Sequence, residues 1–118
     1  MTRRILITGS RTWTDTATIR TALAEVWGDG TAVLITGCCP RGADHLAELT
    51  WIRCGGLVER HPSEWTRYGR SAGFRRNAEM VAAGADVCLA FIRAGSRGAT
   101  HTARLADAAG IPTRRYTQ

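Results

Sequence analysis

The chain has 118 residues, a net charge of +6 and sixteen basic residues, all of them Arg. This length fits one domain with one hydrophobic core, so we expect residues 1–118 to form a single domain. The charge would suit a polyanionic partner, but the arginines are spread along the sequence, as a genome-wide preference for Arg would also produce. Nucleic acid is therefore a possible but not a favoured partner.

The predicted elements of the first half alternate between strand and helix. The apolar run at 4–8 predicts a strand, and the spacing of apolar residues at 15–27 predicts a helix that Gly28 and Gly30 end. A second, fully apolar strand is predicted at 32–36, which is typical of a central parallel strand. A helix at 42–54 and a short strand at 57–60 follow.

The second half continues this alternation after a long loop, predicted at 61–73. This loop is rich in aromatic and basic residues, including Trp65 and Arg70, as functional loops often are. We then predict a helix at 74–83, a strand at 86–92, a helix at 99–109 and a closing strand at 111–116.

Strict alternation of strand and helix predicts an α/β fold. We expect a single Rossmann-like domain, with a parallel five-stranded sheet, helices on both faces and right-handed crossovers. If the strand order is 3-2-1-4-5, the first and fourth strands flank the topological switch point. A ligand is then expected beyond the carboxyl ends of these strands.

Three strands end in a glycine-containing loop that leads into a helix. Such junctions direct unpaired backbone N–H groups and the positive end of a helix dipole at one point, which is how proteins hold phosphates. Each loop also supplies an arginine, which binds phosphate through two hydrogen bonds. The predicted ligand residues in these loops are Gly9, Ser10, Arg11, Gly37, Arg41, Gly42, Gly95, Ser96, Arg97 and Gly98.

Four further residues are candidates with two interpretations each. Asp44 either complements a helix dipole or contacts a ribose hydroxyl. Trp13 and Trp65 either belong to a half-buried core or stack on a base. His101 is an acid or base, or an ordinary surface histidine.

The cysteines indicate neither a metal site nor a disulfide framework. Cys38, Cys39, Cys54 and Cys88 show no C-x-x-C spacing, and we expect Cys54 and Cys88 to be buried. A metal site built from Cys38, Cys39, His45 and His101 would lack the usual ligand spacing, so we predict no metal and no cofactor. The amino terminus enters a strand directly, without a signal peptide or membrane span, so we expect a cytoplasmic protein with no membrane association.

Four motifs, taken together, carry a resemblance to a known family. They are Gly9-Ser-Arg-Thr-Trp13, Gly37-x-x-x-Arg-Gly-Ala-Asp44, Arg76-Asn-Ala-Glu-Met80, and Gly95-Ser-Arg-Gly98 with His101. In this order and spacing they resemble the YspA-type branch of the SLOG superfamily, which also includes the LOG phosphoribohydrolases and the DprA/SMF DNA-processing proteins. The resemblance implies a Rossmann-like fold that binds a nucleotide or nucleotide-derived ligand, with Arg76 and Asn77 at its site.

The resemblance to the LOG enzymes also bears on catalysis. Arg76 is similar to the arginine that those enzymes use, whereas Thr102 stands where their catalytic glutamate belongs. Cleavage of an N-glycosidic bond needs a carboxylate, and threonine cannot replace it. Either Asp44 or Glu79 takes this role, or the chain binds its ligand without cleaving it.

Two functional hypotheses follow, and we favour the first. The protein is a binding or sensor domain for a nucleotide or an ADP-ribose-like ligand, or it is a LOG-like hydrolase of nucleoside monophosphates. Single-stranded DNA binding, as in the DprA proteins, is a weaker third hypothesis. We further expect a homodimer whose contact involves the apolar helix faces bearing Trp51 and Met80.

Overall fold

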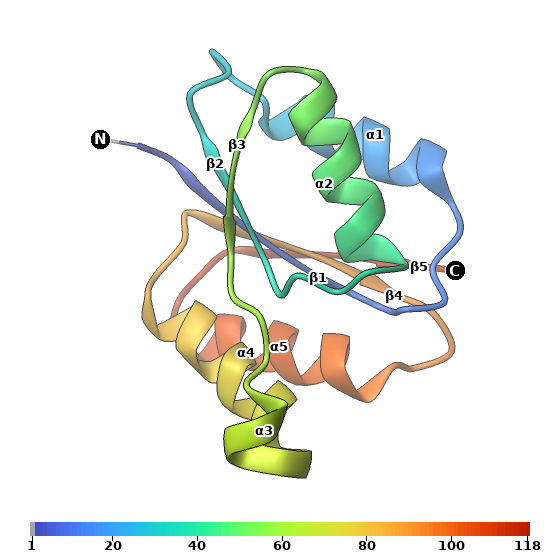
Figure 1. The fold of residues 1–118 in the computed structure, drawn as a ribbon. Coiled ribbons are helices and arrows are strands. Elements are labelled where there is room, and N and C mark those ends of the chain that lie inside the picture. The colour runs from blue at the N-terminus through green and yellow to red at the C-terminus, as the bar shows by residue number, and fades with distance from the viewer. Residues whose placement is uncertain (1) are drawn as a thin grey trace.

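One five-stranded parallel sheet, with the strand order β3-β2-β1-β4-β5, forms the centre of the molecule (Figure 1). The computed structural model describes residues 2–118. The strands are β1 (Arg4–Gly9), β2 (Val33–Thr36), β3 (Leu57–Arg60), β4 (Val87–Ile92) and β5 (Thr113–Thr117). The predicted fold class and strand order are confirmed.

Helices cover both faces of the sheet. Two of them, α1 (Thr16–Val26) and α2 (Ala43–Arg53), lie on one face, whereas α4 (Ala72–Ala82) and α5 (Arg97–Ala108) lie on the other (Figure 1). Within residues 2–118, no helix is long and apolar enough to span a membrane.

The prediction of a loop at 61–73 is wrong for most of this segment. It contains the short helix α3 (Trp65–Tyr68) and the 3-10 turn η1 (Gly69–Ser71), and α4 begins already at Ala72. Gly69, which has a φ of +56°, breaks the chain between these pieces, so neither shows the long apolar period of a helix.

The core forms two layers because the side chains of a strand alternate between the faces of its sheet. Ile5 and Ile7 of β1 pack under α1 and α2, while Leu6 packs on the opposite face with Met80 of α4. All three β1 side chains are fully buried, as expected for a central parallel strand.

Trp13 belongs to the first of these layers. Its side chain is only 2% exposed and packs edge-on against Phe91, with 5.4 Å between the ring centroids. Its Nε1 donates a hydrogen bond to the carbonyl oxygen of Asp15 at 2.9 Å. The expectation that Trp13 stacks on a base is therefore wrong, since the indole is committed to the core.

Two other expectations about burial are also wrong. Trp51 and Met80 are almost fully buried within the chain, so their side chains are not available for a dimer contact. Cys54, expected inside, is exposed at the end of α2, whereas Cys88 lies buried in β4 as expected. Burial raises the pKa of the Cys88 thiol to about 12.

Candidate functional site

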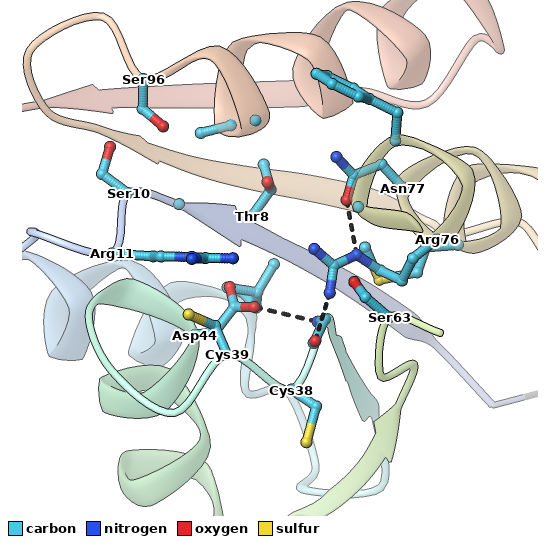
Figure 2. A pocket seen from close by; sticks show the side chains of 18 of the residues that line it. Thr8, Ser10, Arg11, Cys38, Cys39, Asp44, Ser63, Arg76, Asn77 and Ser96 are labelled. Carbon is cyan, nitrogen blue, oxygen red and sulfur yellow. Dashed lines mark hydrogen bonds between the residues drawn. The ribbon is translucent and has the colours of Figure 1, made fainter. Parts of the chain in front are cut away.

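A pocket of about 720 Å³ opens at the carboxyl ends of β1, β2 and β4, where the order of the strands reverses. This is the edge at which open α/β sheets hold their ligands. Figure 2 shows side chains of the three glycine loops and of α4 around this pocket. The predicted residues that line it are Gly9, Ser10, Arg11, Gly37, Asp44, Trp65, Arg76, Asn77, Ser96 and Gly98.

Six predicted site residues do not line the pocket that the described chain forms: Arg41, Gly42, Gly95, Arg97, the candidate acid Glu79 and the buried Trp13. Glu79 is exposed on α4. Conversely, sequence reasoning missed Phe74 and Arg93, which do line the pocket, as does Arg70 of the loop expected to be functional. Arg93 directly follows β4, so its place after a predicted strand was a usable signal.

The helices α1, α2 and α5, which follow the three glycine loops, differ in the side chains at their N-termini. Asp15 caps α1, because its Oδ1 accepts a hydrogen bond from the Thr18 N–H at 3.1 Å. The first turn of α2 carries Asp44. In contrast, the first turn of α5 has no acidic residue, and within residues 2–118 the N-cap Ser96 makes no side-chain capping bond. Of these three, α5 is the one that, in the described part of the chain, has neither a capping side chain nor an acidic residue in its first turn, so its N–H groups are open to an external anion.

Gly9 and Gly42 bring α2 close to the end of β1. A Cβ at Gly9 would overlap the Ala43 side chain, and a Cβ at Gly42 would overlap the Ser10 carbonyl oxygen. Gly42 also has a φ of +75°, a conformation that favours glycine. The Ala43 N–H donates to that same Ser10 carbonyl at 3.1 Å. The lack of a side chain at these two glycines thus allows the start of α2 to pack closely against the end of β1.

Hydrogen bonds of Ser10 link the first glycine loop to the third. Its hydroxyl accepts a hydrogen bond from the Arg93 N–H at 2.8 Å and donates one to the Arg93 carbonyl oxygen at 3.3 Å. The Arg93 guanidinium in turn donates to the Thr12 carbonyl oxygen at 2.6 Å. The two loops beside the α5 N-terminus are therefore held together before any ligand arrives.

Arg76 reaches from α4 across to the second glycine loop (Figure 2). Its Nη1 donates to the Gly37 carbonyl oxygen, and its Nε donates to Asn77 Oδ1 at 2.8 Å. A Cβ at Gly37 would overlap this guanidinium, so the glycine leaves the space that Arg76 occupies. Burial lowers the pKa of Arg76, and the neighbouring Asp44 opposes this shift.

Asp44 is the one acidic residue that lines the pocket in the described chain. Only 7% of the residue is exposed, and its Oδ2 accepts a hydrogen bond from the Gly37 N–H at 3.2 Å. Its Oδ1 is buried and has no hydrogen-bond partner among residues 2–118. Burial raises the pKa of Asp44 to about 6, although the charge of Arg76 and the N–H groups of Cys39 and Gly37 act in the opposite direction.

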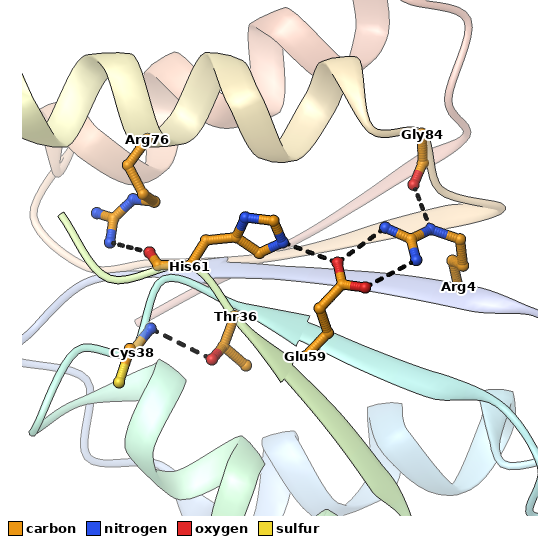
Figure 3. A network of polar contacts seen from close by, with 7 residues as sticks. All are labelled: Arg4, Thr36, Cys38, Glu59, His61, Arg76 and Gly84. Atoms are coloured by element: carbon orange, nitrogen blue, oxygen red, sulfur yellow. Dashed lines mark hydrogen bonds and ion pairs between the residues drawn. The ribbon is translucent and has the colours of Figure 1, made fainter. Parts of the chain in front are cut away.

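A polar network supports Arg76 from the side of β3 (Figure 3). Both terminal nitrogens of Arg4 bind the Glu59 carboxylate, at 3.1 and 2.9 Å, and His61 Nε2 lies 2.7 Å from the same group. The hydrogen bonds from Arg4 and His61 lower the pKa of Glu59 to about 2. The His61 carbonyl oxygen then accepts a bond from Arg76 Nη1 at 3.5 Å. The network therefore links the charge at the end of β3 to the pocket.

Aromatic side chains form the outer rim of the pocket. Trp65 is 53% exposed and, like the half-exposed Phe74, lines the opening. His101 contacts Phe74 edge-on, with 4.8 Å between the ring centroids, and is not part of the lining in the described chain. Stacking of a base on Trp65 remains a prediction.

Thr102 does not contribute a group to the pocket of the described chain. It is completely buried in α5, where its hydroxyl donates to the Gly98 carbonyl oxygen at 3.1 Å. Nor does any cluster of three His, Cys, Asp or Glu side chains suitable for a metal ion occur within residues 2–118. The chemistry that the pocket offers is that of arginines, backbone N–H groups and the Asp44 carboxyl.

Comparisons with known proteins agree with the motifs. The Gene 61 protein of Mycobacterium phage D29 is 45% identical over 116 residues, which cover 93% of each chain. The structure of the Moco Carrier Protein from Chlamydomonas reinhardtii matches with a TM-score of 0.66 at 16% identity. This match covers all of the present chain and 78% of the other, and it supports the fold alone.

The family comparison identifies the chain more directly than the structural match does. The model of the YspA, cpYpsA-related SLOG family (YAcAr) matches residues 3–68, which include the first two glycine loops and Asp44. Since this match spans more than half of the chain, the protein belongs to the YspA, cpYpsA-related SLOG family.

Proposed function

We propose that the protein binds a nucleotide or nucleotide-derived ligand in the pocket at the carboxyl edge of the sheet, as a binding or sensor domain. The observation that carries this proposal is the uncapped N-terminus of α5, which opens into a pocket that arginines line. An anion there gains hydrogen bonds from N–H groups that the helix itself leaves unpaired. Phosphate is the anion that Arg11 and Arg93 would hold together with these groups.

The remaining features of the pocket suit the rest of a nucleotide. Trp65 and Phe74 offer exposed ring faces at the rim, and aromatic faces bind nucleobases by stacking. Arg70 lies at the same rim and adds a planar cation. The pocket thus has one end suited to an anion and another lined by aromatic rings, which matches the phosphate and the base of a nucleoside phosphate.

Calorimetric titration with AMP, ADP, ADP-ribose and adenosine tests the proposal. We expect the phosphorylated compounds to bind at least about tenfold more tightly than adenosine, since a charge-assisted hydrogen bond contributes about 1.5–3 kcal/mol. Gly98→Val should abolish binding by filling the space in front of the α5 N-terminus, while Gly98→Ala serves as the smaller control. A Cβ at this position meets no atom within 4 Å in residues 2–118, so Gly98→Ala should keep the circular dichroism of the parent, and the same measurement checks the fold of Gly98→Val. Failure of every nucleotide to bind would disprove the proposal.

Hydrolysis of a nucleoside monophosphate is the second candidate function, and Asp44 is the observation that favours it. A buried carboxyl with a pKa of about 6 beside Arg76 resembles the acids that act on glycosidic bonds. Chromatographic detection of adenine released from AMP tests this function. We expect no release above a blank for the wild type. Release that Asp44→Asn abolishes and Glu79→Gln leaves intact would make the protein a hydrolase with Asp44 as its acid.

A further inference from the structure

The unpartnered oxygen of Asp44 points to a specific recognition event within the proposed nucleotide site. Resting on the function proposed above, we infer that Asp44 Oδ1 accepts a hydrogen bond from a ribose hydroxyl of the ligand, so that the pocket selects ribonucleotides over deoxyribonucleotides. Two independent observations carry this inference: the isolation of Oδ1, and the place of Asp44 relative to the α5 N-terminus.

The buried Oδ1 atom of Asp44 lacks a hydrogen-bond donor in the part of the chain that the structure describes. The Asp44 side chain lies in the pocket lining, yet 93% of the residue is withdrawn from solvent. The Cys39 N–H lies near enough to lower the pKa of the carboxyl, but no donor among residues 2–118 forms a hydrogen bond to Oδ1. Buried acceptors are nearly always paired, because a buried polar atom without a partner costs free energy. In the free protein, no hydrogen bond within the described chain offsets the free energy lost by burying Oδ1. A ligand that brings a donor to this oxygen would therefore recover it on binding.

The surroundings restrict the donor to a neutral group of the ligand. The Asp44 carboxyl repels a phosphate, which has a better place at the N-terminus of α5. Arg76 is already engaged by the Gly37 carbonyl and by Asn77, and it forms no ion pair with Asp44 within residues 2–118. A hydroxyl is the neutral donor that a nucleotide presents nearest to its phosphate.

The strand order sets the distance that the ligand must bridge. Asp44 follows β2 and the α5 N-terminus follows β4, with β1 between them. Two inter-strand spacings place these positions roughly 10 Å apart. The 5′-phosphate and the ring hydroxyls of one nucleotide, each with a hydrogen bond of about 3 Å to the protein, fit a gap of this size. In Figure 2, Asp44 faces the hollow from the side opposite Ser96.

The experiment compares the affinities of wild-type protein for AMP, 2′-deoxy-AMP and 3′-deoxy-AMP by calorimetry. We expect at least one deoxynucleotide to bind about tenfold or more weakly than AMP. In Asp44→Ala this preference should fall to less than about twofold, because the carboxylate that reads the hydroxyl is gone. Glu25→Gln removes an exposed carboxylate from α1 and should leave the preference unchanged.

The outcomes separate the inference from the function on which it rests. Equal affinity of the wild type for all three compounds overturns the inference but leaves nucleotide binding standing. A preference that Asp44→Ala retains also overturns it, since another group then reads the hydroxyl. Absence of binding for all three compounds overturns the proposed function and the inference together. If Asp44→Ala does not fold, the wild-type comparison decides, since equal affinity for the three compounds overturns the inference.

Discussion

The burial of Asp44 makes the stability of the protein depend on pH, because the charged carboxylate is less stable in the fold than in the unfolded chain. Its pKa is raised by burial from 3.8 to about 6, so the folded state binds the proton more tightly than the unfolded state does. The stability that this protonation contributes is fully present below about pH 4 and is lost as the pH rises through 6. A shift of this size corresponds to a free energy on the order of 3 kcal/mol.

Comparison of the wild type with Asp44→Asn isolates this contribution. We expect the free energy of unfolding of the variant, relative to the wild type, to rise between pH 4 and pH 7, by up to about 3 kcal/mol. The amide is never charged, and it can still accept the Gly37 N–H. Urea denaturation at several pH values measures the difference. A constant difference across this range would show that Asp44 titrates in the fold as it does in the unfolded chain.

Gly37 and Arg76 act as one unit at the residue scale. Gly37→Ala would place a methyl group where the Arg76 guanidinium lies, and the flexible end of the arginine is the group that must move. We therefore expect Gly37→Ala to weaken AMP binding by about as much as Arg76→Ala does, with a change in unfolding free energy below about 1 kcal/mol.

Calorimetry of the two single variants and of the double variant checks this expectation. Because both substitutions remove the same guanidinium position, their effects should not add in the double variant. Arg104→Ala, an exposed arginine of α5, is the matched control. Additive losses would mean that Gly37 contributes to binding by a route that does not include Arg76.

At the scale of elements, the contact between β1 and α2 depends on the absence of a side chain at Gly9. The atoms that a Cβ would meet are the Ala43 Cβ and the backbone oxygen and Cβ of Phe91. None of these is the end of a flexible side chain, so the helix or the strand must shift. We predict that Gly9→Ala lowers the unfolding free energy by about 1–3 kcal/mol.

The control for this prediction is Gly98→Ala, at a position where the same methyl group meets open space in the described chain. Gly98 lies inside α5, where alanine is favoured over glycine by up to about 1 kcal/mol. The two substitutions should therefore change the midpoint of urea denaturation in opposite directions. A neutral Gly9→Ala would indicate that α2 is held less closely than the distances imply.

At the scale of the whole molecule, exposed apolar side chains gather at one edge of the sheet. Leu49 and Ile52 share a face of α2, and Leu57, which is 63% exposed, begins the outer strand β3. Apolar groups clustered in this way are typical of contact surfaces. They replace Trp51 and Met80 as candidates for the expected homodimer contact, since those two side chains are buried.

We predict a two-fold dimer that this edge mediates. Light scattering across a dilution series should give the mass of two chains at high concentration, and Ile52→Ser with Leu57→Ser should shift the equilibrium toward the monomer. Circular dichroism of the double variant confirms that the fold is kept. A wild-type protein that stays monomeric at every concentration would remove the prediction.

The sequence by itself determined the architecture and the edge of the sheet that holds the site. Apolar runs of strand length and the helical spacing of apolar residues are local signals, and in an alternating chain they lead to a parallel sheet with few possible topologies. Local signals also placed Gly9 and Gly37 directly beside strand ends, and Gly98 just before the last predicted helix. They did not show the short helix at Trp65–Tyr68, which makes only about one turn and is too short for an apolar spacing to repeat.

Only the tertiary structure decided which candidate residues are exposed in the pocket and which groups each of them contacts. Trp13 and Trp65 look alike in sequence, but the packing of Phe91 against Trp13 buries one indole and leaves the other at the rim. The three similar loops differ in the fold because Asp15 caps α1 and Asp44 places a carboxyl in the first turn of α2, whereas α5 has neither a capping side chain nor an acidic first turn in the described chain. The raised pKa of Asp44 reflects its burial, opposed by the charge of Arg76 from α4, and burial of that kind is a property of the packed molecule that no local pattern encodes.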